Sequence, residues 1–71
     1  MIQVVGEILT SLSMEDYRGE INVILEGNRI NIGFDCILTP DQIRSIDIDK
    51  KDTLMIGIDE QKKKSYISVD L

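Results

Sequence analysis

The stretch from residue 20 to residue 38, EINVILEGNRINIGFDCIL, alternates between apolar and polar side chains on both sides of Gly27-Asn28. An alternation of period two is typical of a β-strand, whereas a helix would need apolar residues at intervals of three and four. Gly and Asn tolerate positive φ, and they are favoured in the tight turns that join antiparallel strands. The stretch therefore predicts one β-hairpin that turns at these two residues.

A two-residue turn also fixes which residues of the two strands lie opposite one another. The pairs predicted on the inner, apolar face are Leu25 with Ile30, Val23 with Ile32, Ile21 with Phe34, and Gly19 with Cys36. The pairs predicted on the outer face are Glu26 with Arg29, Ile24 with Asn31, Asn22 with Gly33, and Glu20 with Asp35. A slip of one residue would bury Asn and Glu, so we expect this register.

The first twelve residues are also read as a strand. Ile2 and Val4 alternate, but Val5 and Ile8 break the strict alternation. A β-bulge near Gly6 would re-aim the side chains and account for the change of phase. The next residues, SLSMEDYR, are polar and rich in capping residues, and they predict a loop with at most one turn of helix.

After the hairpin, Thr39 and Pro40 give the strongest helix-start signal in the chain. Thr39 can cap the helix, Pro40 suits its first position, and Gln42 completes a capping box. A short helix is predicted over residues 40–45. A competing interpretation is that residues 46–49 are already a strand, joined by a three-residue loop to the strand that follows.

Residues 53–59 and 64–71 predict a second hairpin. The register that keeps one face apolar pairs Ile56 with Ile67, Leu54 with Val69, and Asp59 with Lys64. In this register Tyr66 lies opposite Gly57, where its ring can cover exposed glycine backbone.

These elements predict a single all-β domain over residues 1–71. The expected fold is a small antiparallel barrel or sandwich of five to six strands, with one short helix near residues 40–45. An OB-like barrel and an SH3-like barrel with a helical insert both fit this order of elements. Such an analogy of topology carries no function by itself.

Composition excludes several classes of function. The chain has 71 residues, a net charge of −5, one Cys and no His. It offers no catalytic triad or zinc site, so we expect no enzyme activity, no metal and no cofactor. The acidic charge disfavours nucleic acid, and no apolar run is long enough to span a membrane. An unpaired Cys favours a cytoplasmic protein.

Two acidic groupings resemble sites, and both have simpler interpretations. Glu20 and Asp35 face each other across the hairpin, and Arg18 lies on the same face, so we expect a solvated pair that Arg18 screens. Residues 47–52 have the spacing of a calcium loop, but Asp52 replaces the required Gly and Lys51 occupies a ligand position. That stretch is interpreted as a surface turn.

The remaining signal is apolar surface opposite the main core set, at Val5, Ile24, Ile37, Met55 and Tyr66. It favours a non-enzymatic, homo-oligomeric module that binds and masks a partner protein with a basic surface. Small size and an Ile- and Lys-rich composition fit inhibitors encoded by phages or mobile elements. The alternatives are a small-ligand or nucleotide binder with a site at a subunit interface, and an OB-like nucleic-acid binder, which the charge disfavours. The candidate partner-binding residues are Arg18, Glu20, Asn22, Ile24, Asn31, Asp35 and Tyr66.

Overall fold

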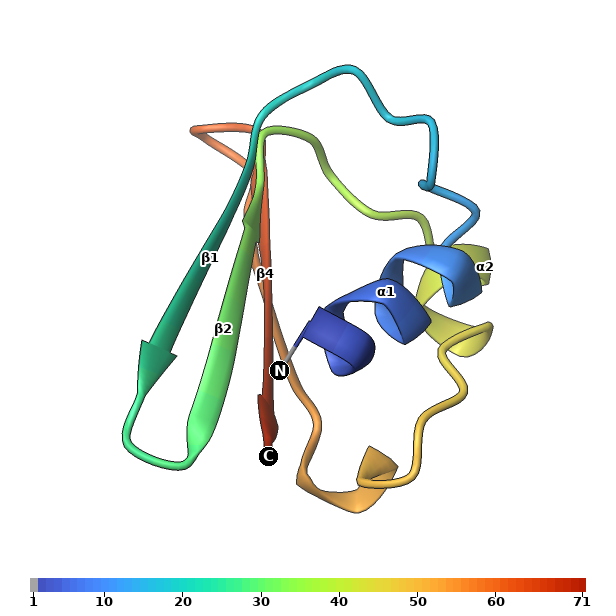
Figure 1. Ribbon diagram of the computed structural model, residues 1–71. Coiled ribbons are helices and arrows are strands. Elements are labelled where there is room, and N and C mark those ends of the chain that lie inside the picture. Colours follow the sequence, from blue (N-terminus) through green and yellow to red (C-terminus); the bar gives the residue numbers. More distant parts are fainter. Residues whose placement is uncertain (1) are drawn as a thin grey trace.

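The computed structural model describes residues 2–71 as an open four-stranded antiparallel sheet with helices on one face only (Figure 1). The strand order is β1-β2-β4-β3. In chain order the elements are α1 (Ile2–Ser11), β1 (Ile21–Glu26), β2 (Arg29–Phe34), α2 (Pro40–Arg44), the 3₁₀ turn η1 (Lys51–Thr53), β3 (Met55–Asp59) and β4 (Lys64–Asp70). No helix within residues 2–71 has both the length and the apolar character that crossing a membrane requires.

The first hairpin has the predicted register. Ile21 lies opposite Phe34, Ile24 opposite Asn31, and the remaining strand pairs follow in step. Gly27 has a φ of +59°, which side chains with a Cβ rarely adopt, so a glycine at this position lets the chain reverse within two residues. The turn and the period of the flanking residues thus determine this part of the fold together.

The prediction of an N-terminal strand with a bulge at Gly6 is wrong, because residues 2–11 form helix α1. The apolar side chains of Val4, Ile8 and Leu12 recur every four residues, which is the period of a helix face. Ile8 and Leu12 are buried, whereas Gly6 is exposed on the opposite side of the helix. The break in alternation that suggested a bulge was therefore a helical repeat.

The core lies between the helices and the inner side of the sheet. Its buried hydrophobic residues are Ile8, Leu12, Met14, Ile30, Ile32, Phe34, Leu38, Ile46, Ile67 and Val69. One polar side chain shares this layer: Ser65 is fully buried, and its hydroxyl oxygen accepts a hydrogen bond of 2.9 Å from the backbone N–H of Leu38. That bond satisfies the buried hydroxyl and anchors the loop after β2 to strand β4.

The prediction of a short helix after the first hairpin is confirmed. Helix α2 begins at Pro40, with Thr39 as its N-cap and a complete capping box between Thr39 and Gln42. The Gln42 side-chain amide also donates a 3.2 Å hydrogen bond to the carbonyl of Leu12. The same residue therefore starts α2 and connects it to the end of α1.

The predicted fold class, a barrel or sandwich of five to six strands, is wrong. Residues 46–49 form no strand, and the interpretation that paired them with the next strand fails with them. Ile46 is buried beneath the sheet, and η1 carries the chain into β3. With a helix at the N-terminus and no strand here, the described chain has no strands that would close a barrel, and the sheet stays open.

The second hairpin also has the predicted register. Ile56 lies opposite Ile67, Asp59 opposite Lys64, and Gly57 opposite Tyr66. Strand β4 pairs with β2 on its other side, which places Ile67 between Ile32 and Ile56. The two hairpins are therefore joined through their second strands, and β1 and β3 become the edges of the sheet.

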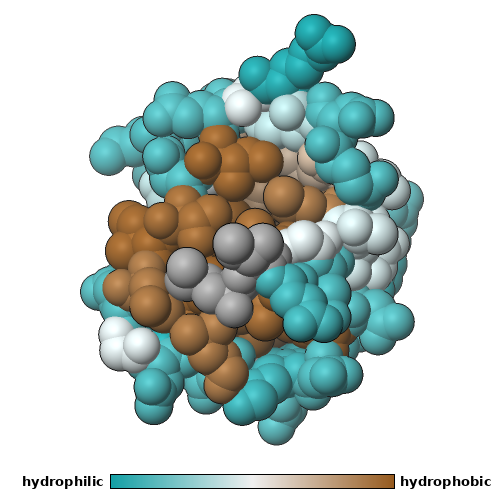
Figure 2. Space-filling model, viewed as in Figure 1, coloured by the Kyte–Doolittle hydropathy of each residue, from teal (hydrophilic) through white to brown (hydrophobic). Residues whose placement is uncertain are grey.

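One part of the first hairpin differs from the predicted burial. Val23 and Leu25 were expected in the core opposite Ile32 and Ile30, yet they are 42% and 50% exposed, whereas Ile30 and Ile32 are fully buried. Strand β1 is an edge strand, and the helices lie over the centre of the sheet, so its inner row is covered only in part. Hydrophobic surface gathers on the side of the molecule where β1 lies (Figure 2).

The helical state of the N-terminus predicts the effect of one substitution. A methyl group at Gly6 would meet nothing within 4 Å, so Gly6→Ala should stabilise the protein by about 0.5–1 kcal/mol through helix propensity. The measurement is the free energy of unfolding from urea titrations monitored by circular dichroism. Gly27→Ala is the matched control, and it should destabilise by about 1–2 kcal/mol because of its positive φ. Equal effects at the two positions would contradict the assignment of α1.

Candidate functional site: the open face of the sheet

The side of the sheet opposite the helices is uncovered within residues 2–71, and we call it the open face. Its side chains lie in cross-strand rows defined by the strand register. One row holds Ile24, Asn31, Ser68 and Met55, and the next holds Asn22, Gly33, Tyr66 and Gly57. Charged rows at the two ends hold Glu26, Arg29 and Asp70, and Glu20, Asp35, Lys64 and Asp59.

Tyr66 is the central large side chain of the open face. It stands on β4 between Gly33 and Gly57 of the two neighbouring strands. A Cβ at Gly33 would lie 3.7 Å from two ring carbons of Tyr66, and a Cβ at Gly57 would lie 4.0 Å from a third. The ring thus covers glycine backbone on both sides, while 46% of the residue stays exposed. This arrangement places an exposed aromatic ring at the middle of the open face.

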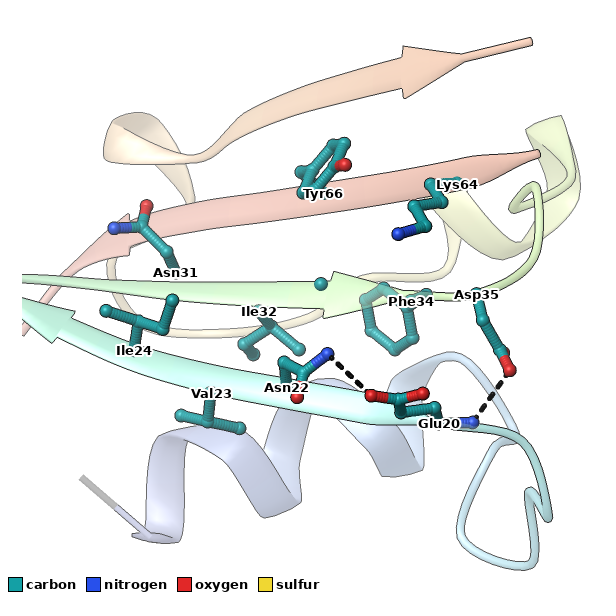
Figure 3. A pocket seen from close by; sticks show the side chains of 11 residues that line it. Glu20, Asn22, Val23, Ile24, Asn31, Ile32, Phe34, Asp35, Lys64 and Tyr66 are labelled. Atoms are coloured by element: carbon teal, nitrogen blue, oxygen red, sulfur yellow. Dashed lines mark hydrogen bonds between the residues drawn. The ribbon is translucent and has the colours of Figure 1, made fainter. Parts of the chain in front are cut away.

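A hollow of about 350 Å³ lies beside this ring, over β1, β2 and β4 (Figure 3). Gly33 forms part of its floor and contributes no side chain, which leaves room between the side chains of β1 and β4. Six of the seven candidate residues line this hollow: Glu20, Asn22, Ile24, Asn31, Asp35 and Tyr66. The seventh, Arg18, is exposed in the loop before β1 and is not part of it.

Three large apolar side chains give the open face its hydrophobic character. Ile24 is 58% exposed and Met55 is 64% exposed, and they stand on opposite edge strands in the same row. Tyr66 lies in the next row. Of the other apolar residues expected on this side, Val5 packs against the core from α1, and Ile37 lies in the loop after β2. The five apolar residues predicted to share one side therefore lie on different surfaces.

Hydrogen bonds stiffen one end of the open face. Arg29 donates to the Asp70 carboxylate at 2.5 Å, to the Ser68 hydroxyl at 3.0 Å and to the carbonyl of Thr53 at 2.9 Å. These bonds join β2 to β4 and to η1. The amide of Asn31 donates to the Glu26 carboxylate at 2.7 Å, across the first hairpin. The polar side chains here are held in fixed positions, which favours recognition over conformational adaptation.

The other end is organised by Asp35. Its carboxylate accepts a hydrogen bond from the Tyr17 hydroxyl and one of 2.8 Å from the backbone N–H of Glu20 (Figure 3). The predicted screening by Arg18 is wrong, since within residues 2–71 no salt bridge joins Arg18 to Glu20 or Asp35. The two carboxylates are accommodated instead because Asp35 turns toward Tyr17 and the backbone.

These contacts shift two pKa values. The hydrogen bond from the Glu20 backbone, followed by that from the Tyr17 hydroxyl, lowers the pKa of Asp35 below its usual 3.8, and the charge of Lys64 adds a small contribution. The hydrogen bond to Asp35, followed by that to Cys36, raises the pKa of Tyr17. Asp35 therefore stays ionised and Tyr17 stays neutral across the physiological range.

Gly19 makes this arrangement possible. A Cβ at Gly19 would lie 2.3 Å from the Tyr17 hydroxyl oxygen and 2.5 Å from a carboxylate oxygen of Asp35. Such distances are far inside van der Waals contact, so a side chain at this position would displace the Tyr17 hydroxyl. The absence of a side chain here lets Tyr17 reach back to the end of the hairpin.

Sequence reasoning missed two contributors to the site. Lys64 lines the hollow but was not among the candidate residues; its predicted pairing with Asp59 was the signal that its side chain lies on this face. Tyr17 gave no signal, because its contact with Asp35 spans 18 positions and depends on the path of the loop.

The shared hydrogen bond predicts a linked pH dependence. Because the folded-state pKa of Asp35 is depressed, its ionised form contributes stability above pH 3.8, and this contribution is lost as the pH falls through the folded value. Tyr17→Phe should raise the pKa of Asp35 toward 3.8 but not fully, since the Glu20 N–H bond remains. NMR titration of the Asp35 carboxyl carbon measures the change. Tyr66→Phe is the control and should leave the Asp35 value in place, while an unchanged value in Tyr17→Phe would contradict the assigned contact.

No protein-family model, curated protein sequence or solved structure matches this chain. The functional argument therefore depends on the geometry and chemistry of the open face.

Proposed function

We propose that the chain is a non-enzymatic interaction module that uses the open face to bind and mask a basic surface of a partner protein. The observation that carries the proposal is the uncovered sheet face itself, where exposed Ile24, Met55 and Tyr66 stand between two rows of mostly acidic side chains. A hydrophobic centre with a polar rim is the usual anatomy of a protein-protein interface.

The apolar side chains supply the binding energy in this proposal. Tyr66 is a suitable anchor because tyrosines are enriched among the residues that dominate interface energetics, and its ring lies next to the glycines of both neighbouring strands. Ile24 and Met55 flank it on the two edge strands. Each of these side chains is about half exposed, so burying the rest of it contributes on the order of 1 kcal/mol through the hydrophobic effect.

The charge of the rim supports a basic partner. Five carboxylates border the open face, and two cations accompany them, Arg29 and Lys64; the carboxylates are those of Glu20, Glu26, Asp35, Asp59 and Asp70. Such an excess attracts a positively charged surface and steers its approach. Nucleic acid would be repelled by the same charge, so an inhibitor of a protein that handles nucleic acid fits better than a binder of nucleic acid.

Two features of the sequence support the remaining parts of this proposal. The chain has no His, and its one Cys lies outside the open face, which fits a role in binding rather than catalysis. A single Cys that has no partner in the sequence also fits a cytoplasmic place of action, where thiols stay reduced.

The hollow beside Tyr66 favours one second candidate, a small-ligand site. Its volume of about 350 Å³ lies near the lower end of the range for ligand pockets, and Asn22 and Asn31 would offer polar contacts. A ligand of the folded state must raise the melting temperature, so thermal shifts across a panel of nucleotides and metabolites test this candidate.

The protein-binding proposal predicts different outcomes for two faces of the sheet. Met55→Asp and Tyr66→Asp should each weaken partner binding by roughly tenfold or more, because each removes a hydrophobic anchor and puts a carboxylate that must lose its water into the apolar part of the contact. Ile58→Asp is the matched control: Ile58 is 44% exposed on the same edge strand as Met55, but it points to the other side of the sheet. The fold of each variant is checked by circular dichroism.

The measurement is quantitative affinity capture with each variant as bait, followed by binding titrations with the recovered partner. A partner that is retained by Ile58→Asp, lost by both open-face variants and weakened by added salt agrees with the proposal. A partner that binds all four forms equally would contradict it.

A further inference from the structure

We propose that the free edge of β1 pairs with β1 of a second copy of the chain, in an antiparallel two-fold dimer with one continuous eight-stranded sheet. This proposal concerns the edge of the sheet, and it goes beyond the proposed function, which uses the open face.

The strand register shows which backbone groups of β1 are available. In the first hairpin the N–H of Asp35 donates to the carbonyl of Glu20, so Glu20 and every second residue after it face β2. The N–H and C=O groups of Ile21, Val23 and Leu25 therefore point away from the sheet. Within residues 2–71 no strand lies on that side of β1.

Strand β1 lacks the devices that protect an edge from pairing. Its sequence INVILE has no Lys, no Pro and no Gly, and five of its six residues are exposed. The opposite edge strand, β3, is shorter, contains Gly57 and Asp59, and runs into a turn with two lysines. A regular, apolar edge without such devices is a template for a further strand. The asymmetry between the two edges makes β1 the place where such a strand would add.

One register of β1 against itself is chemically complementary. When Ile24 lies opposite Ile24 of the second copy, Val23 lies opposite Leu25, and Asn22 lies opposite Glu26. Val23 and Leu25 then exchange backbone hydrogen bonds, and the two-fold axis repeats the pair on the other side of Ile24. Their side chains are the 42% and 50% exposed ones of the helix side, and each would cover the other.

The same register also gives compatible side-chain pairs on the open face. The two Ile24 side chains, each 58% exposed in the single chain, meet at the axis as a closely spaced pair that is not hydrogen bonded. The Asn22 amide comes opposite the carboxylate of Glu26, to which it can donate. Apolar residues therefore meet apolar residues on both sides of the joined sheet, and the one charged residue meets an amide.

The neighbouring registers are worse. A shift that centres the pairing on Val23 places Glu20 opposite Glu26 twice, and like charges directly opposite are destabilising. A shift that centres it on Asn22 places Ile24 opposite Glu20 and leaves Leu25 opposite Gly19. A shift that centres it on Leu25 places Ile24 opposite Glu26. Of these registers, the one centred on Ile24 pairs Ile24 with Ile24 and Val23 with Leu25, and it sets no like charges opposite each other, although Ile21 then faces Gly27 of the turn. This match depends on two identical strands. For this reason the occupant is a second copy and not an unrelated peptide.

A two-fold axis through Ile24 perpendicular to the sheet keeps the helices of both copies on the same side. The two open faces then form one surface with two Tyr66 side chains. The strands are short, so the joined edges bury less than the roughly 1,200 Å² of a stable standard interface, and we expect an association of micromolar strength. A partner with two matching sites would bind such a dimer more tightly than a single chain, because the second contact forms within the same complex.

The first test removes an outward backbone donor. Val23→Pro deletes the N–H that points away from the sheet and leaves the bonds to β2 in place, and proline is tolerated on edge strands. Sedimentation velocity of the wild type at high micromolar concentration should show a dimer, and Val23→Pro should show a folded monomer by sedimentation and circular dichroism. Met55→Asp is the control, because it alters the open face away from the edge and should remain dimeric.

The second test addresses the axis and remains decisive if Val23→Pro fails to fold. Ile24→Asp and Ile24→Lys should each be monomeric, since each would place two like charges together at the axis. Their mixture should form a heterodimer, because opposite charges then meet. A monomeric wild type, a Val23→Pro variant that dimerises as the wild type does, or a mixture without heterodimer would each overturn the proposal. Loss of partner binding in Met55→Asp with the dimer intact separates this proposal from the proposed function.

Discussion

The pairing of β2 with β4 is the interaction on which the rest of the structure depends. It joins the two hairpins of the chain through residues 35 to 39 positions apart, with Ile30 opposite Val69 and Ile32 opposite Ile67. All four of these side chains are fully buried beneath the helices. Because side chains alternate along a strand, the same pairing that forms this core also presents Asn31, Tyr66 and Ser68 on the other side. The core and the candidate site are therefore two consequences of one register.

This central pairing also determines which apolar residues stay exposed. Two hairpins joined through their second strands leave their outer strands, β1 and β3, at the edges. The helices α1 and α2 are short and cover the middle of the sheet, so Val23 and Leu25 are half covered although their partners on β2 are fully buried. Within residues 2–71 there is no further helix to cover β1, so the core does not extend over its inner side.

Local signals explain what could be predicted from the sequence. Both hairpin registers and the cap of α2 depend on residues at most 13 positions apart, and all three were predicted correctly. The N-terminal helix was missed because Gly6 and the β-branched residues around it have low helix propensity, which obscured the four-residue repeat of Ile8 and Leu12. The open fold was missed as a consequence, since a barrel needed that segment as a strand. Tertiary packing overrode propensity at this point.

The candidate site was predictable to the extent that it depends on the same registers. Six of the seven candidate residues share one hollow because the alternation of the first hairpin and the position of Tyr66 on β4 were right. The prediction that Arg18 belongs to the site was wrong because Arg18 precedes the strand. The path of the chain there is set by the contact of Tyr17 with Asp35 and by Gly19. The degree of burial of an inner side chain cannot be predicted from local alternation alone. Alternation assigned Val23 to the core, but only the strand order shows that β1 is an edge.

Both proposals involve the same residue of strand β1, Ile24. Ile24 belongs to the open face by its side chain and to the free edge by its place on β1, so it would stand at the centre of a joined sheet while still facing a partner. A partner that contacts both copies of Ile24 would bind the dimer more tightly than the single chain. By thermodynamic linkage such a partner must then favour dimer formation by the same factor. Weak self-association and partner binding would thus reinforce each other, and a small module would assemble fully only on its target.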